Sequence, residues 1–160
     1  MDKISVGIGE GKTAVNQQIL ISYALGSCVG VCMYDRDKKI AGMAHIVLPG
    51  KESAVSRENP YKFADEGVKE LIREMERAGA SRKRITAKIA GGAKMFDVAG
   101  NGSLGSIGQR NIDSVHQVLQ QEHVRLLRED VGGRSARTLL FDVATGEGCI
   151  KVVGKPEKIL

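Results

Sequence analysis

The apolar residues of this chain fall into short runs and only two segments with helical periodicity, and this order constrains the fold more than any other feature. The short runs cover residues 4–8, 18–22, 29–35, 40–47, 84–90, 124–129, 137–143 and 149–153. In residues 60–78 and 107–122, apolar residues instead recur every three or four positions. Strands at both ends of the chain, with two helices and a strand between them, predict an α+β fold: a layered α/β sandwich with mixed, largely antiparallel sheets.

The starts of both helical segments carry local signals. Asn59 and Pro60 are typical of an N-cap followed by proline at the first helical position, and Gly79 is placed to end that helix. Ser106 and Gln109 have the spacing of a capping box. The first helix is therefore expected to begin at Pro60 and the second directly after Ser106.

The length of 160 residues favours one domain spanning residues 1–160, which can bury roughly 70% of its unfolded surface. The three cysteines, Cys28, Cys32 and Cys149, form no C-x-x-C pair and follow no secretion signal, so we expect free thiols in a cytoplasmic protein. The longest nearly apolar stretch, residues 40–48, is about half of a membrane span. Membrane insertion is therefore not expected.

The net charge of +5 raises the question of an acidic partner, and the densest basic cluster is Arg82 to Arg84 with Lys88 close behind. Aromatic residues are only 4% of the chain and tryptophan is absent, so stacking platforms for nucleic acid are scarce. We therefore expect no nucleic-acid partner. A positive net charge of this size indicates a solvated surface, or electrostatic steering of the protein toward an acidic partner protein.

Two glycine-rich segments resemble phosphate-binding loops without their usual context. Residues 7–13 lack the first glycine of a Walker A loop, and no βαβ unit follows the G-x-G-x-x-G match at residues 100–105. His116 and His123 are separated from each other and from the cysteines by spacings that do not suit zinc. No cofactor or metal is therefore expected.

Cys28 and His45 are the strongest candidates for chemistry. Gly26 and Gly30 flank the cysteine and permit a sharp turn that could present backbone N–H groups to an oxyanion. His45 lies on the strand expected to pair with the one that follows Cys28, and Ser22 supplies a hydroxyl that could orient the imidazole. From the residues alone, a buried structural thiol in a glycine-rich turn remains an equal alternative.

The chain resembles the CheD family, the chemoreceptor glutamine deamidases. The matching segments follow the family order along most of the chain: Leu25 to Val31, Gly42 to Pro49, Ala87 to Phe96, Ile107 to Asn111 and Glu129 to Gly133. A chance match to one short motif does not produce such an order.

This resemblance implies a cysteine hydrolase that converts receptor glutamines to glutamate, with Cys28 as nucleophile and His45 as general base and acid. It places Ser22 where the family has a threonine, which keeps the hydroxyl but loses the methyl group that restricts its rotamers. Backbone groups of Gly26 and Ser27 would hold the oxyanion. Phe96 and the loop of residues 50–58 would border the site.

The resemblance also implies partners and a second activity. The substrate would be the helical cytoplasmic domain of a chemoreceptor, and a CheC-type phosphatase would be a further partner. Hydrolysis of receptor methyl esters could proceed through the same thioester. The alternative is a non-catalytic chemotaxis adaptor that binds the receptor or the phosphatase.

Overall fold

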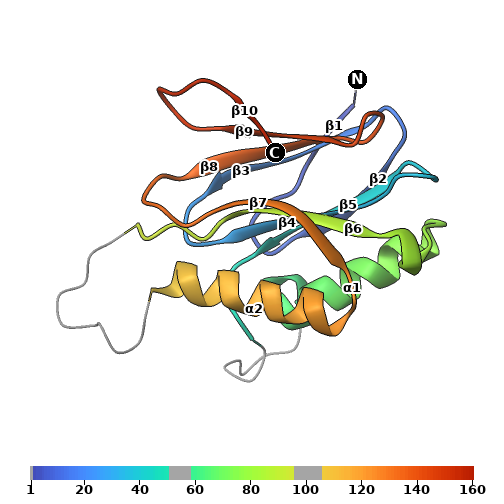
Figure 1. Cartoon of the computed structure of the whole chain (residues 1–160), viewed down its shortest axis with the longest axis horizontal. Coiled ribbons are helices and arrows are strands. Elements are labelled where there is room, and N and C mark those ends of the chain that lie inside the picture. Colours follow the sequence, from blue (N-terminus) through green and yellow to red (C-terminus); the bar gives the residue numbers. More distant parts are fainter. Residues whose placement is uncertain (1, 51–58, 96–105) are drawn as a thin grey trace.

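The structure is a computed structural model that describes residues 2–50, 59–95 and 106–160. Two five-stranded sheets lie face to face, and both helices cover the outer face of one of them (Figure 1). The elements in chain order are β1 (Lys3–Ser5), β2 (Gly11–Val15), β3 (Ile19–Leu25), β4 (Val29–Asp35), β5 (Ile40–Ile46), η2 (Pro60–Lys62), α1 (Ala64–Arg77), η3 (Arg82–Arg84), β6 (Thr86–Gly91), α2 (Ile107–Gln121), β7 (Arg125–Val131), β8 (Arg137–Asp142), β9 (Glu147–Lys151) and β10 (Lys158–Ile159). The predicted α+β class with two helices is confirmed.

The strand order is β1-β3-β8-β9-β10 in the first sheet and β2-β5-β4-β6-β7 in the second. Within the described residues, β1 with β3 and β6 with β7 are the parallel pairs, and the other neighbours run antiparallel. The β6–β7 pair is parallel because α2 connects the two strands and returns the chain to the same end of the sheet. The mixed, largely antiparallel sheets were therefore predicted correctly.

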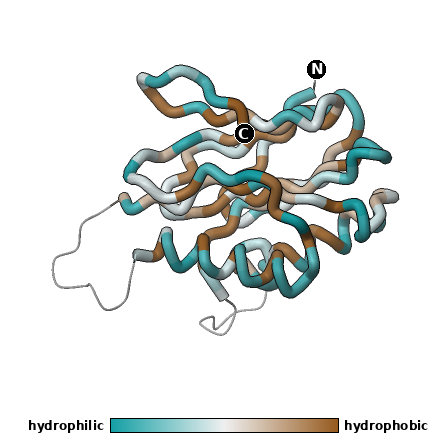
Figure 2. The backbone as a smooth tube through the Cα atoms, in the orientation of Figure 1, coloured by the Kyte–Doolittle hydropathy of each residue, from teal (hydrophilic) through white to brown (hydrophobic). Residues whose placement is uncertain are grey.

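The helix-covered sheet has an apolar layer on each of its faces. On one face, side chains such as Val31, Met33 and Ile89 pack against the apolar sides of α1 and α2. On the other, Cys32 and Met43 pack against the first sheet. The central strands β4 and β5 are buried at every position, which explains their continuous apolar runs instead of alternation (Figure 2).

The first helix begins later than expected. Asn59 does act as a cap, but the turn that it caps is the short 3₁₀ helix η2, where its side chain accepts a hydrogen bond from the Tyr61 amide at 3.2 Å. Phe63 is then extended and pairs with Leu48, so α1 starts only at Ala64. The second helix begins as predicted, and Ser106 accepts a hydrogen bond from the Gln109 amide at 3.1 Å.

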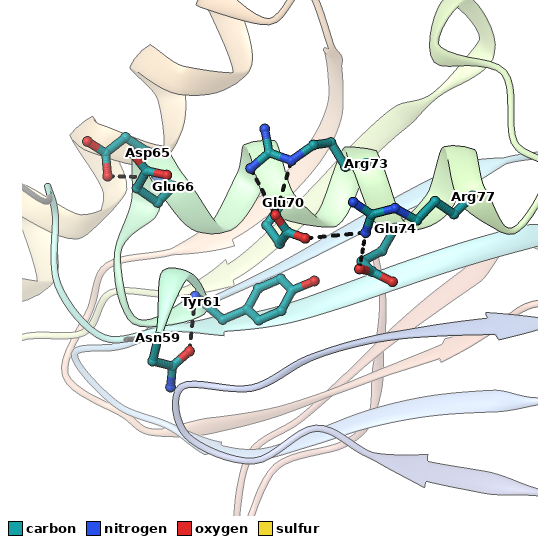
Figure 3. Close-up of polar contacts among 8 residues, drawn as sticks. All are labelled: Asn59, Tyr61, Asp65, Glu66, Glu70, Arg73, Glu74 and Arg77. Atoms are coloured by element: carbon teal, nitrogen blue, oxygen red, sulfur yellow. Dashed lines mark hydrogen bonds and ion pairs between the residues drawn. The ribbon is translucent and has the colours of Figure 1, made fainter. Parts of the chain in front are cut away.

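The outer side of α1 is held by ion pairs between neighbouring turns (Figure 3). Glu70 accepts hydrogen bonds from Arg73 at 2.9 and 3.0 Å, and Arg77 lies 3.5 Å from the same carboxylate and also pairs with Glu74. The ring of Tyr61 lies against Gly11 of β2, where a side chain would come within 2.2 Å of it. This contact joins the start of the helical segment to the edge of the sheet.

Two strands were missed from the sequence. β2 pairs antiparallel with β5 although residues 7–13 had suggested only a glycine-rich turn, and the turn is in fact confined to residues before Gly11. Ala14 is the only residue of β2 that is fully buried, so this edge strand carries almost no apolar signal. The two-residue strand β10 is similarly exposed.

Candidate active site

Ser22 and His45 meet between the two sheets. Ser22 lies on β3 of the first sheet and is fully buried, and His45 lies on β5 of the second sheet and is 2% exposed. The Ser22 Oγ atom lies 2.8 Å from Nδ1 of His45. Two residues that lie 23 positions apart in the sequence are thus in direct hydrogen-bond contact.

The hydrogen bonds of the hydroxyl determine which imidazole nitrogen carries the proton. Ser22 Oγ donates to the carbonyl oxygen of Val6 at 2.8 Å, and a hydroxyl has one proton to donate. It must therefore accept from His45, which places a proton on Nδ1 and leaves a lone pair on Nε2. That Nε2 atom is buried and has no hydrogen-bond partner within the part of the chain that the structure describes.

The surroundings of His45 favour the neutral imidazole. Burial lowers the pKa of His45 below its ordinary value, and the Val6 carbonyl and the Glu10 carboxylate oppose this effect only in part. A neutral ring with an unprotonated Nε2 is the form that can accept a proton from an acidic donor.

Cys28 lies in the turn between β3 and β4, at the edge of the same inter-sheet core. Gly30 pairs opposite His45, and Cys28 precedes it by two residues, so alternation places both side chains on the same face of the sheet. The half-buried sulfur packs against the inter-sheet cluster. No hydrogen bond joins it to His45 in the described residues, and burial raises the pKa of the Cys28 thiol. The resting pair is therefore a neutral thiol and a neutral imidazole.

The carbonyl groups of the Cys28 turn all point into the protein. The Gly26 oxygen accepts from the Ala93 amide at 2.7 Å, and the Cys28 oxygen accepts from the Gly92 amide at 2.8 Å. The oxygen of Ser27 accepts from a side chain of α2, Asn111, at 2.9 Å. Because N–H and C=O point in opposite directions across a trans peptide, the amides of Ser27 and Cys28 face the other way. Both can serve as oxyanion donors.

A strained bulge in β3 and two exposed side chains lie next to this site. The pairing of β3 with β8 shifts register directly after Ser22, and Ala24 in the bulge has a φ of 54°. Tyr23 in the same bulge is 57% exposed. Met95 lies beside Gly26 and is also exposed. Of the predicted border residues, Phe96 and residues 51–58 of the loop lie outside the described residues.

The remaining candidates have structural surroundings. Cys32 is buried in the core, whereas Cys149 is half-buried and lies 3.4 Å from a carboxylate oxygen of Glu157. His116 pairs with Glu129 at 2.6 Å. In the described ranges, no group of three or more histidine, cysteine or acidic residues is placed to hold a metal. None of the described helices is long and apolar enough to cross a membrane.

The basic cluster and a surface pocket beside Tyr34 lie away from Cys28. Arg82 pairs with Glu122 at 2.7 Å, and Arg84 pairs with buried Asp35 at 3.0 Å. A pocket of about 500 Å³ opens beside Tyr34, at the opposite end of β4 from the cysteine. The cationic groups named here are therefore engaged within the protein itself.

The sequence did not reveal what supports the cysteine turn. Gly91 and Gly92 drew notice only as part of the matching segment Ala87 to Phe96, yet a side chain at Gly91 would come within 2.2 Å of the Cys28 oxygen. Asn111 was noted only as part of a motif, without a role. Its chain separation from Ser27 hides the contact, because it forms only when α2 packs on the sheet.

Comparison with known proteins finds a matching family and related sequences. A family profile described as "CheD chemotactic sensory transduction" matches residues 47–152. The chain is 43% identical over 157 residues to "Probable chemoreceptor glutamine deamidase CheD" of Syntrophomonas wolfei, with 98% of each chain covered. It is 42% identical over 158 residues to the protein of the same description from Desulforamulus reducens, with 99% and 95% covered.

Structural comparison supports the fold alone. A crystal structure of a Neisseria meningitidis protein superposes with a TM-score of 0.54 at 11% sequence identity. The match covers 83% of this chain and 64% of that one. The layered arrangement of sheets and helices is thus shared with a protein of very different sequence.

Proposed function

Since this chain belongs to the CheD family, we propose that it hydrolyses the side-chain amides of chemoreceptor glutamines to glutamate and ammonia. The resemblance seen in the sequence is thereby confirmed. The observation that carries the proposal is the buried Ser22–His45 pair, whose unpartnered Nε2 lies on the sheet face that also bears Cys28. A receptor glutamine would reach this face at the half-buried cysteine turn.

The first step forms a tetrahedral intermediate. Nε2 of His45 takes the thiol proton as Cys28 Sγ bonds to the glutamine Cδ, and the carbonyl electron pair moves to the oxygen. The amides of Ser27 and Cys28 stabilise this oxyanion. Because burial raises the thiol pKa and lowers the imidazole pKa, proton transfer accompanies attack instead of preceding it.

The later steps return the proton and release the product. The protonated His45 donates its Nε2 proton to the amide nitrogen, the Cδ–N bond breaks, and ammonia leaves a thioester on Cys28. Water then attacks Cδ while Nε2 takes one of its protons. The Cδ–S bond breaks, the sulfur recovers that proton from His45, and the new carboxylic acid loses its remaining proton to solvent as glutamate.

Ser22 orients the imidazole without adding a charge. It accepts from Nδ1 and donates to Val6, so the ring cannot rotate or change tautomer without breaking a buried hydrogen bond. A neutral partner does not raise the histidine pKa as a carboxylate would. This supports proton acceptance by Nε2 at neutral pH.

The proposal extends to partners and a related reaction. Methyl esters of receptor glutamates would pass through the same thioester, with methanol leaving in place of ammonia. The helical cytoplasmic domain of the receptor is the proposed substrate, and a CheC-type phosphatase is a proposed partner. Both interactions would occur in the cytoplasm.

The proposal is tested by incubating the protein with a receptor cytoplasmic fragment and following conversion of glutamine to glutamate by mass spectrometry. We expect conversion by the wild type and by Cys149→Ala, which removes another partly exposed thiol, and none by Cys28→Ala. Conversion by Cys28→Ala at the wild-type rate would overturn the mechanism. Binding of the fragment without conversion by the wild type would favour the adaptor alternative.

A further inference from the structure

We propose that Asn111 is a positioning residue that aims the Cys28 amide and fixes the cysteine turn against the strand of the general base. This inference rests on the proposed function, because it assigns a role within the same site. Asn111 lies near the start of α2 and is fully buried. It is one of the few buried polar residues of the described chain.

The side-chain amide of Asn111 makes two donor contacts. Nδ2 donates to the carbonyl oxygen of Ser27 at 2.9 Å and to that of Val47 at 2.9 Å. The amide nitrogen has two protons, so these contacts use both of them. The opposite orientation would place Oδ1 against two carbonyl oxygens, so the contacts also fix which way the amide faces.

The contact with Ser27 acts on the next residue. The Ser27 carbonyl and the Cys28 N–H belong to one planar peptide, so holding the oxygen aims the N–H in the opposite direction. A hydrogen bond to the oxygen also polarises the peptide and strengthens its N–H as a donor. Burial raises the pKa of the Cys28 thiol, and the N–H of Cys28 itself opposes this effect in part. An oxyanion formed on a carbon bonded to Sγ would lie beside that donor.

The contact of Asn111 with Val47 links the helix to the strand that carries His45. Val47 follows β5 and lies two residues after His45. One side chain from α2 therefore joins the turn that carries the thiol to the strand that carries the imidazole. Helix α2, on the outer layer, thus sets the distance between the Cys28 thiol and the His45 imidazole, which lie at the layer between the sheets.

The side-chain oxygen of Asn111 indicates that packing alone does not explain why an asparagine stands at this position. Oδ1 of Asn111 is buried and has no hydrogen-bond partner among the described residues. A buried acceptor without a hydrogen bond is destabilising. An apolar side chain of similar size would avoid that cost, whereas only a donor can hold both carbonyl groups. The two donor contacts therefore account for the asparagine.

The test compares Asn111→Ala with Val118→Ala, a buried position on the same helix. For Asn111→Ala we expect kcat for receptor deamidation to fall about 10- to 100-fold, since one oxyanion donor is worth 10²–10³-fold, with KM little changed. We also expect the pH profile of Cys28 alkylation to shift to higher pH. Val118→Ala should lower the free energy of unfolding while leaving kcat and the alkylation profile unchanged.

Equal loss of kcat in the two variants, with an unchanged alkylation profile, would show that Asn111 has only a structural role. The alkylation assay needs no substrate, so it tests the positioning of Cys28 even if the wild type converts no glutamine. If Asn111→Ala does not fold, Asn111→Asp keeps the shape and replaces the donor by an acceptor. A folded Asn111→Asp protein with wild-type kcat and alkylation would also overturn the proposal.

Discussion

The single proton of the Ser22 hydroxyl determines which nitrogen of His45 carries a proton. It goes to the Val6 carbonyl, so the histidine must donate from Nδ1 and keep Nε2 as an acceptor. The sequence predicted that Ser22, Cys28 and His45 belong together, since glycines mark the turn and the hairpin brings the histidine near. It could not predict the proton arrangement, because Val6 enters only through the pairing of β1 with β3.

Replacing Ser22 tests the orientation of the imidazole. Ser22→Ala removes the acceptor for Nδ1–H, and we expect kcat to fall about 10- to 100-fold, a part of what positioned acid–base catalysis contributes. Ser22→Thr keeps the hydroxyl and should retain most of the wild-type kcat. The measurement is the initial rate of receptor deamidation at saturating substrate. A Ser22→Ala variant with the wild-type rate would contradict the role of the hydroxyl.

The lowered pKa of His45 predicts how stability depends on pH. The unfolded state takes up a proton on this ring near pH about 6.5, whereas the folded state does so only at lower pH. The contribution of His45 to the free energy of unfolding is therefore present above that pH and is lost as the pH falls through the folded-state pKa. In urea titrations at several pH values, the stability difference between wild type and His45→Gln should narrow toward acid. A difference that widens toward acid would contradict this sign.

At the scale of elements, the cysteine turn is held by its neighbours more than by itself. The end of β6 and the start of α2 approach so closely that a side chain at Gly108 would come within 2.5 Å of the carbonyl oxygens of Gly92 and Ala93. The amides of Gly92 and Ala93, directly after β6, then donate hydrogen bonds to the carbonyl oxygens of the turn. The helical periods and strand runs predicted these elements well, but the contacts between them depend on packing distances that no local pattern contains.

Gly91→Ala tests this support, with Gly154→Ala as its matched control. Both glycines have positive φ, 115° and 80°, so alanine at either position is strained, at a cost of about 1–3 kcal/mol. Only at Gly91 does the added carbon come within 2.2 Å of the Cys28 oxygen, while nothing lies within 4 Å at Gly154. We expect Gly91→Ala to lose deamidase activity and Gly154→Ala to keep it. Equal activity in both folded variants would show that the turn tolerates displacement.

At the scale of the whole molecule, the apolar interior has two layers, and only the layer between the sheets adjoins the Ser22–His45 pair. The layer under the helices contains Leu71, and the layer between the sheets contains Leu20, which shares the inward face of β3 with Ser22. The order of strand and helix signals predicted a layered sandwich. It could not show which sheet the helices cover, because β2 and β10 carry too little apolar signal to complete the strand order.

Two cavity-forming variants distinguish these layers. Leu71→Ala and Leu20→Ala should each lower the free energy of unfolding by about 2–5 kcal/mol, since both leucines are fully buried. At a temperature where both remain folded, we expect Leu20→Ala to lose more deamidase activity, because its cavity adjoins the Ser22–His45 contact. Chemical denaturation and initial rates provide the comparison. The reverse ranking of activities would mean that the inter-sheet layer does not control the site.

The Ser22–His45 hydrogen bond joins the two sheets, so the proposed general base and the residue that orients it also connect the two layers of the fold. Changing either one therefore alters the architecture as well as the chemistry. Cys28 contributes only a half-buried sulfur at the border of the core. For capturing a receptor in its bound, unconverted form, we therefore expect Cys28→Ala to be the suitable bait, because it would remove the proposed nucleophile and leave the Ser22–His45 hydrogen bond between the sheets intact.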